Sequence, residues 1–152
     1  GLLRFVVSTS YSRKHSNEKG YIYFQDFMPG NTYDIRIVVI GNKAFGAKRM
    51  VRKNDFRASG GGDSLFARSE VDERCVRIAF DVSRQLNTQS LAYDFVYDEY
   101  DNPLITEVSY CWPMMISDRS VGYWDSKLNW YDEKMNPQVW QIEDFIAGLK
   151  TR

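Results

Sequence analysis

The chain has 152 residues, of which 43% are hydrophobic and 15% aromatic, enough for one domain with a buried core. Twenty Lys and Arg residues balance twenty Asp and Glu residues, so the overall charge gives no reason to expect a nucleic acid or an acidic membrane surface as partner. The single histidine, His15, excludes a His-based metal site or catalytic triad within this chain. Two cysteines and the absence of a long apolar run or signal peptide favour a reduced, cytoplasmic protein without a membrane segment.

The first elements in chain order are predicted strands. Residues 21–27 form one, and residues 33–40 form a second in which apolar side chains alternate with more polar ones. Gly41 and its following asparagine are typical of a two-residue hairpin turn. We therefore expect residues 43–52 to pair back along residues 33–40.

This hairpin brings charged residues together. It places Arg49 opposite Asp34, and Arg36 on the same face of the sheet. One interpretation is a salt-bridge cluster on a solvated surface. The other is a nucleotide site, in which the arginines reach phosphate oxygens and Asp34 accepts a hydrogen bond from a ribose hydroxyl. The residues by themselves leave both open.

A glycine-rich loop and a helix follow. In residues 53–64, Arg57 precedes three consecutive glycines, which suit either an anion-binding nest or a flexible linker. No Walker or Rossmann phosphate-binding motif is present. Ser69 and Asp72 resemble a capping box. Apolar residues then recur at helical spacing and predict an inward helix face: Val71, Cys75, Ile78, Ala79, Val82 and Leu86.

Residues 91–110 predict a second hairpin, with its turn at residues 99–103. With the turn centred after Tyr100, Asp94 lies directly opposite Glu107 and the two carboxylates share one face. Paired carboxylates suit Mg²⁺ when its other ligands are water and phosphate. The alternative is a pair of solvated acidic side chains, and the hairpin taken by itself favours that alternative.

The last third of the chain has a less regular sequence pattern. Residues 111–133 have no clear period, and their aromatic side chains are expected to pack or to line a pocket. Asn136 and Pro137 predict the start of a final helix. Its expected inward face comprises Val139, Ile142, Phe145, Ile146 and Leu149. The element order predicts an α+β fold with a mostly antiparallel sheet flanked by helices.

A family resemblance rests on five motifs taken in order. They are QDF at 25–27, DIRIVVIG at 34–41, NDFRASGGG at 54–62, YDF at 93–95 and ITEVS at 105–109. In this order the chain resembles the C-terminal lobe of ATP-grasp ligases, closest to the ribosomal-protein-tailing glutamate ligases and the glutathione synthetases. The resemblance implies an ATP-grasp C-terminal subdomain that uses ATP and Mg²⁺, with Mn²⁺ as an alternative.

The resemblance also implies roles for particular residues. Asp26 and Phe27 match the hinge at the adenine end of ATP, and Asp34 matches the ribose-binding aspartate. Arg57 matches the arginine of the family's DFR motif, near the triphosphate and the acceptor, and we expect Arg36 and Arg49 to act with it as catalytic residues. Asp94 and Glu107 match two of the Mg²⁺ ligands, and Ser109 is at the position of the third. Ser109 stands where the family has asparagine, and because a hydroxyl is a poorer Mg²⁺ ligand, it puts the second metal in doubt.

Such enzymes activate a small carboxylate as an acyl phosphate for attack by an amine or a thiol. We expect residues 1–152 to form one domain, with residues 1–20 as a polar lead-in and residues 111–152 as a family-specific tail. The family's ATP-clamping lysines and glycine-rich lid would precede Gly1, so we expect the N-terminal lobe of the same protein as a partner and no activity from this chain alone.

Two alternatives stay open. The first is a non-catalytic ATP-grasp-like domain that binds a nucleotide or a partner. The second is an RNA-binding module built on basic residues 43–57, which the balanced charge and the acidic hairpin disfavour. A homodimer also stays open, since the exposed half of a cleft could pair.

Overall fold

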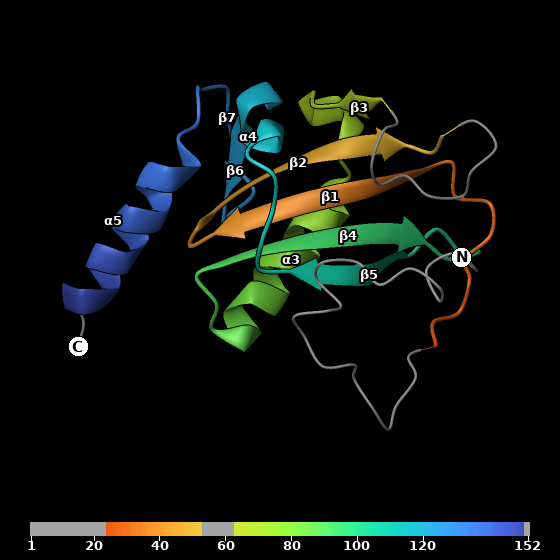
Figure 1. Ribbon diagram of the computed structural model, residues 1–152, viewed down its shortest axis with the longest axis horizontal. Helices are drawn as coiled ribbons and strands as arrows, with labels where there is room; N and C mark the ends of the chain where they lie inside the picture. Colours follow the sequence, from red (N-terminus) through yellow and green to blue (C-terminus); the bar gives the residue numbers. More distant parts are fainter. Residues whose placement is uncertain (1–23, 53–62, 151–152) are drawn as a thin grey trace, which may run out of the picture.

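The structure of the chain, a computed structural model, describes residues 24–52 and 63–150. It contains a seven-stranded antiparallel sheet and three α-helices (Figure 1). The strands are β1 (Tyr33–Ile40), β2 (Lys43–Met50), β3 (Ser64–Leu65), β4 (Ser90–Tyr97), β5 (Pro103–Ser109), β6 (Tyr123–Asp125) and β7 (Trp130–Tyr131). The helices are α3 (Glu73–Leu86), α4 (Met115–Arg119) and α5 (Pro137–Lys150), with a 3₁₀ turn η1 (Arg68–Glu70). The α+β prediction is confirmed.

The two hairpins predicted from sequence form the centre of the sheet. Its strand order is β5-β4-β1-β2-β6-β7, and β3 also pairs with β2. The β1–β2 turn depends on Gly41, whose φ of 54° lies in the left-handed region that glycine tolerates. A Cβ at Gly41 would also collide with Asp144 of α5. The predicted turn is confirmed, and Asp34 pairs with Arg49 as expected.

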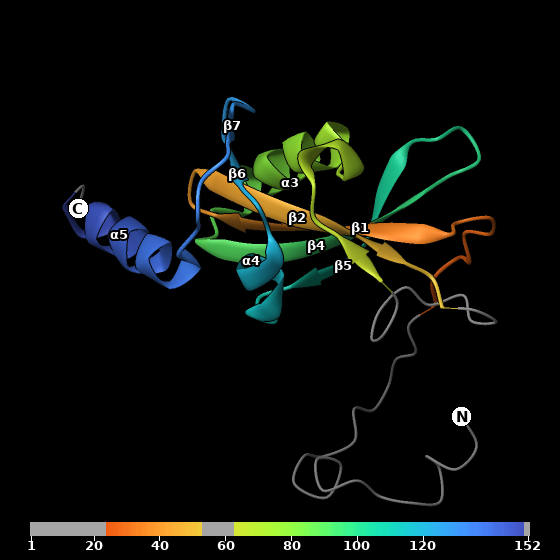
Figure 2. The same ribbon diagram turned by 90° about the horizontal axis from the view of Figure 1, so that it is seen from above.

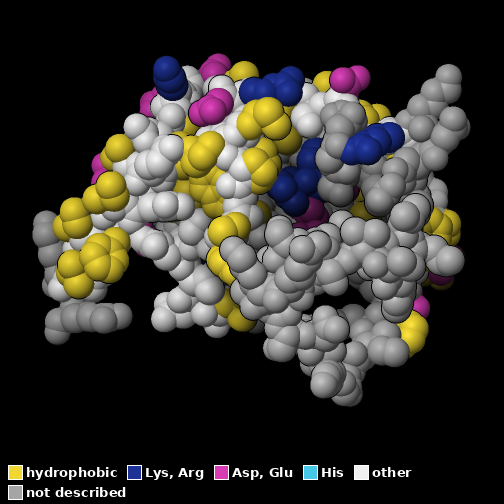
Figure 3. Space-filling view, in the orientation of Figure 1, with side chains coloured by type: hydrophobic (Ala, Val, Ile, Leu, Met, Phe, Trp, Pro, Cys, Tyr) yellow, Lys and Arg dark blue, Asp and Glu magenta, His cyan; other side chains and the backbone are white. Residues whose placement is uncertain are grey.

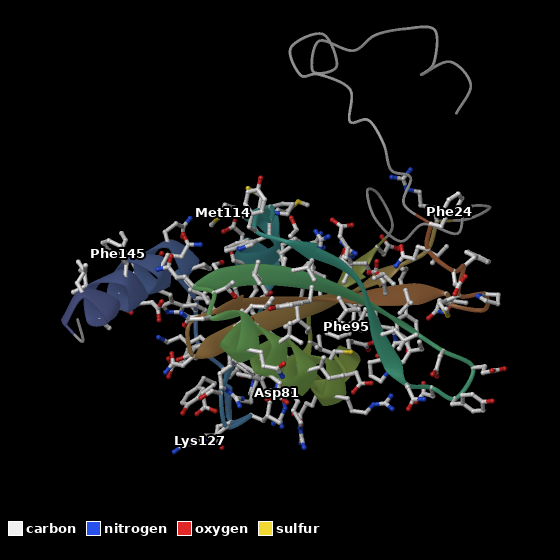
Figure 4. The ribbon with its side chains drawn as sticks, turned by 90° about the horizontal axis from the view of Figure 1, so that it is seen from below. Phe24, Asp81, Phe95, Met114, Lys127 and Phe145 are labelled. Atoms are coloured by element: carbon white, nitrogen blue, oxygen red, sulfur yellow. The ribbon has the colours of Figure 1, made fainter. Side chains whose placement is uncertain are left out.

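Helices cover both faces of the sheet (Figure 2). On one face, Ile35, Ile37 and Val39 pack against α3, and Phe95 lies buried between the sheet and that helix (Figure 4). On the other face, Val38 belongs to a second cluster that contains α4 and α5 side chains. Alternate β1 residues therefore enter different cores, as the period of two predicts.

Helix α3 begins and ends at identifiable caps. The Asp72 side chain accepts a hydrogen bond from the Arg74 backbone N–H, so Asp72 is the N-cap residue. Asn87 ends the helix in the left-handed conformation. Leu86 was expected to face inward, and that prediction is wrong: it is exposed, because Ser83 occupies the buried position of the last turn and its hydroxyl pairs with that of Tyr93.

The first predicted strand needs correction. The described part of the first expected strand, residues 24–27, is not a strand, because side chains rather than a backbone ladder hold it. Residues 21–23, the polar lead-in, and most of the glycine loop, including Arg57, lie outside the described residues. Residues 111–133 have no periodic pattern, yet α4, β6 and β7 form there.

Helix α5 starts where expected, since the Asn136 side chain accepts a hydrogen bond from the Val139 backbone N–H. Its expected inward face is wrong. All five of those residues are exposed, and Trp140 is the large side chain that α5 buries, against Phe45 and Tyr123. Within residues 24–52 and 63–150, no helix is long and apolar enough to cross a bilayer.

Candidate functional site

Four charged side chains lie together on the face of the sheet that carries Val38. Asp34 and Arg36 come from β1, Arg49 from β2 and Asp94 from β4. Strand register explains the grouping, because Asp34 pairs with Arg49 and Arg36 pairs with Asp94. Figure 3 shows basic and acidic side chains together near the centre of this face.

Arg49 bridges the two aspartates. Its Nε donates to Asp34 Oδ1 at 2.6 Å, and its Nη2 donates to Asp34 Oδ2 at 2.5 Å and to Asp94 Oδ2 at 2.7 Å. Arg36 binds Asp94 through Nε and Nη2, both at 2.6 Å. Two-point pairing of this kind fixes the orientation of each planar group as well as its position.

This network is buried. Asp34, Arg49 and Asp94 expose 8%, 8% and 6% of their surface. Burial by itself would lower the pKa of Arg49, but the hydrogen bonds and charges of Asp34 and Asp94 raise that pKa above its ordinary value. Arg49 therefore stays a cation between two carboxylates at any physiological pH.

The second hairpin places Glu107 beside this network. Asp94 pairs with Glu107, as predicted, although the strand pairing next to the turn differs from the expected one. Next to the turn, Phe95 pairs with Ile105 and not with Thr106, one residue away from the expected register. Thr106 is an extra, bulged residue, and beyond it the strands return to the expected register, in which Asp94 pairs with Glu107. The Thr106 hydroxyl donates to the Asp94 backbone carbonyl at 3.1 Å.

A cavity of about 630 Å³ lies at this end of the sheet. Five of the nine residues predicted for the site line it: Asp26, Phe27, Asp34, Asp94 and Glu107. Its walls are residues 25–28 and 30–34, the end of β2 with residues 51–52, and the β4–β5 hairpin. A volume of this size is typical of small-molecule sites.

The wall that carries Asp26 and Phe27 is held by side-chain amides. Asn31 accepts a hydrogen bond from the Tyr97 backbone N–H and donates one to the Tyr97 carbonyl, both at 2.9 Å. The Gln25 side chain donates to the Thr106 carbonyl at 3.2 Å. Asn31 thus pairs with β4 as a strand residue would, and it anchors the loop to the hairpin that carries Asp94.

The other predicted site residues are placed differently. Arg36 and Arg49 adjoin the cavity through Asp94 and Asp34, and they do not line it. The Ser109 hydroxyl donates to the Cys111 carbonyl at 2.8 Å, and Ser109 pairs with Ala92, so it lies further along β5 and away from the cavity lining. Arg57 lies outside the described residues.

Sequence reasoning missed three residues here. Arg52 lines the cavity and is exposed, so it can supply positive charge there. Its place in the basic run of residues 43–57 was the available signal. Asn31 carried only a turn signal, and Thr106 gave none, because an extra residue in a strand has no sequence signature of its own.

Asp94 and Glu107 are the residues that could hold a metal. Their oxygens are hard ligands, and no hydrogen bond or ion pair engages the Glu107 carboxylate within the described ranges, so the donor set fits Mg²⁺. Among residues 24–52 and 63–150, no three acidic, thiol or imidazole side chains converge as a complete metal site. A cation here would need ligands from elsewhere, as Mg²⁺ has when it binds with a nucleotide.

The comparison with known families agrees with this geometry. The family model described as the RimK-like ATP-grasp domain matches residues 8–123, so the chain belongs to the RimK-like ATP-grasp family. Membership implies ATP binding and ATP-dependent ligation in general, and ATP-grasp proteins typically use ATP with Mg²⁺. No curated protein matches the chain at significant similarity.

Proposed function

We propose that the cavity binds ATP with Mg²⁺, and that the chain serves a ligase that activates a carboxylate as an acyl phosphate. The observation that carries this proposal is the shared cavity. The loop matched to the adenine end of ATP, the matched ribose residue and the matched metal ligands were predicted from separate motifs, and residues of all three groups line one space.

Asp26 and Phe27 are assigned to the adenine end, where Phe27 is 66% exposed and can give a ring surface to a base. Asp34 is assigned to the ribose. The Asp34 carboxylate has roughly four acceptor positions, and hydrogen bonds from Arg49 take two of them. A ribose hydroxyl can therefore still donate to Asp34. Arg36, Arg49 and Arg57 are assigned to the phosphate and carboxylate charges.

Asp94 and Glu107 are assigned to the metal. Asp94 already accepts three hydrogen bonds from the two arginines, so Glu107 is the more open ligand. Bound Mg²⁺ would neutralise charge on the phosphate oxygens during transfer. Arg36 and Arg49 fix the orientation of the Asp94 carboxylate for this task.

The proposed reaction transfers the γ-phosphoryl group of ATP to a carboxylate oxygen, which releases ADP. An amine or thiol then attacks the acyl carbon, the bond to the phosphate oxygen breaks, and inorganic phosphate leaves as an amide or thioester forms. The protein contribution is positioning and charge neutralisation, because the transferring group carries dispersed negative charge. The acceptor and the nucleophile are not assigned to particular compounds.

A second candidate is a domain that binds a nucleotide without turnover. The observation that favours it is the engagement of Asp94 by two arginines, together with a serine, Ser109, whose hydroxyl donates to the Cys111 carbonyl and which does not line the cavity. In this candidate the arginine pairs are the permanent partners of Asp94.

The two candidates differ in ADP release. We expect Mg²⁺-dependent ADP formation that rises when a panel of carboxylates and amines is added, measured on a form of the protein that carries both lobes of the ATP-grasp fold. The Asp94→Asn, Glu107→Gln double variant should abolish it, and Glu99→Gln, an exposed carboxylate of the same hairpin, should not. Bound ATP that stays intact with every acceptor would establish the second candidate instead.

A further inference from the structure

Helix α5 turns a mixed polar and apolar face toward its own sheet. Pro137 and Trp140 are buried, Gln141 and Asp144 are partly buried, and the Gln141 carbonyl accepts a hydrogen bond from the Gln89 side chain at 2.7 Å. At 100° per residue these positions form one face of the helix. The apolar face therefore points away from the core, the reverse of an ordinary surface helix.

The opposite face carries the residues that we call the α5 stripe: Val139, Ile142, Phe145, Ile146 and Leu149. They are 42% to 60% exposed. Figure 3 shows hydrophobic side chains along α5, and Figure 1 shows the helix extending from the end of the β1–β2 hairpin. The family match ends at residue 123, so α5 lies outside the part of the chain that the ATP-grasp domain accounts for.

We propose that the α5 stripe is a dimerisation surface, and that its occupant is the α5 stripe of a second copy of this chain. Four of its residues, Val139, Ile142, Ile146 and Leu149, follow the three- and four-residue spacing of a coiled-coil seam. A seam without charged residues is complementary to itself. A two-fold contact between identical surfaces also needs no other component, and it is the commonest form of oligomer.

The available area is sufficient for this contact. Large apolar side chains carry roughly 150 to 250 Å² of accessible surface when open. At the observed exposure the stripe presents on the order of 500 Å² per copy, so a symmetric pair would bury about 1,000 Å², the lower limit for a specific interface. Met114 extends the patch, because the Gln138 side chain of α5 contacts its sulfur at 3.5 Å and Met114 is 37% exposed. In Figure 4, Met114 and Phe145 lie on the same side of the sheet.

The test is the mass of the chain in solution, measured by sedimentation equilibrium from about 1 to 200 µM, the range over which an interface near the lower size limit dissociates. We expect a concentration-dependent rise from 17.8 kDa to twice that value. Ile142→Asp and Ile146→Asp should each weaken the dimer by about 100-fold or more, because each would bury a carboxylate against an apolar seam. Leu86→Asp, at an equally exposed leucine on α3, should leave the dimer unchanged.

Hydrogen exchange locates the contact independently of the variants. Amides of α5 should gain protection as the concentration passes the dimer midpoint, while those of α3 should not. Because the replaced side chains are exposed, the far-UV circular dichroism of the variants should match that of the parent chain. A chain that stays at 17.8 kDa throughout, a dimer that both aspartate variants retain, or a polydisperse aggregate would each overturn the proposal.

Discussion

Asp94 of β4 lies directly opposite Glu107 of β5 because Thr106 is an extra residue in β5. If Thr106 were instead paired in a regular ladder, the register of the turn would continue, Asp94 would face Thr106, and Glu107 would pair with Tyr93. Tyr93 is fully buried on the α3 side of the sheet. A one-residue bulge thus decides whether Glu107 reaches the cavity or turns toward the core.

Deleting Thr106 should therefore keep the Mg²⁺-dependent part of ATP binding, because the ladder would then run directly from the Phe95–Ile105 pair to the Asp94–Glu107 pair. Thr106→Val should reduce that part by about tenfold or less, because it removes only the hydroxyl bond to the Asp94 carbonyl. Isothermal titration with ATP, with and without Mg²⁺, measures both. Loss of the Mg²⁺ dependence in the deletion variant would contradict the assignment, because the Asp94–Glu107 pair would then not be sufficient for the metal.

Arg49→Met should lower the free energy of unfolding by about 3 to 5 kcal/mol, because it leaves the buried Asp34 carboxylate without its partner. Arg68→Met is the matched control. It removes an ion pair to Glu73 whose side chains are 52% and 43% exposed, and it should cost at most about 1 kcal/mol. Urea unfolding measures both, and similar losses would show that the network adds nothing to stability.

Asn31→Ala should weaken adenosine and ATP binding by a similar factor, about tenfold, and leave the affinity for tripolyphosphate unchanged. The substitution removes the two bonds that hold the wall carrying Asp26 and Phe27 against Tyr97. Equilibrium titration with the three ligands separates this effect from general loss of structure. Equal weakening of tripolyphosphate would show that Asn31 has no specific link to the adenine end.

The two thiols should differ in reactivity. Burial raises the pKa of Cys75 to about 12, and its sulfur lies 3.6 Å from the Tyr97 hydroxyl, so it stays an unreactive thiol at neutral pH. Cys111 is exposed. A thiol reagent should modify one cysteine in the folded protein and two in urea, and Cys111→Ser should leave none in the folded state. Rapid modification of Cys75 in that variant would contradict the burial.

Acid stability should depend on Asp72. Burial alone would raise its pKa, but hydrogen bonds from Arg74 and Tyr97 lower the pKa below the ordinary value. Its contribution is therefore complete above about pH 4, where an unfolded aspartate is ionised, and is lost as pH falls through the folded pKa. Asp72→Asn keeps an N-cap acceptor, so its unfolding free energy should fall less steeply below pH 4. Parallel pH profiles would contradict this.

The central hairpins and α3 were predictable because their signals are local. The turn at Gly41, the alternation along β1 and the Asp72 cap depend on neighbouring residues, and from them the Asp34–Arg49 pair follows. The Asp94–Glu107 pair was predicted as well, but from a regular ladder, whereas it forms through the extra residue Thr106.

The remaining features depend on tertiary structure. The apolar spacing of α5 is the same whether its stripe faces the core or solvent. The orientation of the helix is set by Trp140, which packs with Phe45 and Tyr123. The two-residue strand β7 is too short to show a period. Arg36 and Arg49 share Asp94, and this arrangement depends on how three strands lie beside one another.

The most direct test of the central claim is electron paramagnetic resonance of Mn²⁺, a spectroscopic substitute for Mg²⁺, titrated into the chain with and without ATP. We predict one bound Mn²⁺ that requires ATP in the parent chain and in Glu99→Gln, and its loss in the Asp94→Asn, Glu107→Gln variant. ATP-dependent Mn²⁺ binding that survives the double substitution would contradict the assignment of the Asp94–Glu107 pair as the metal site.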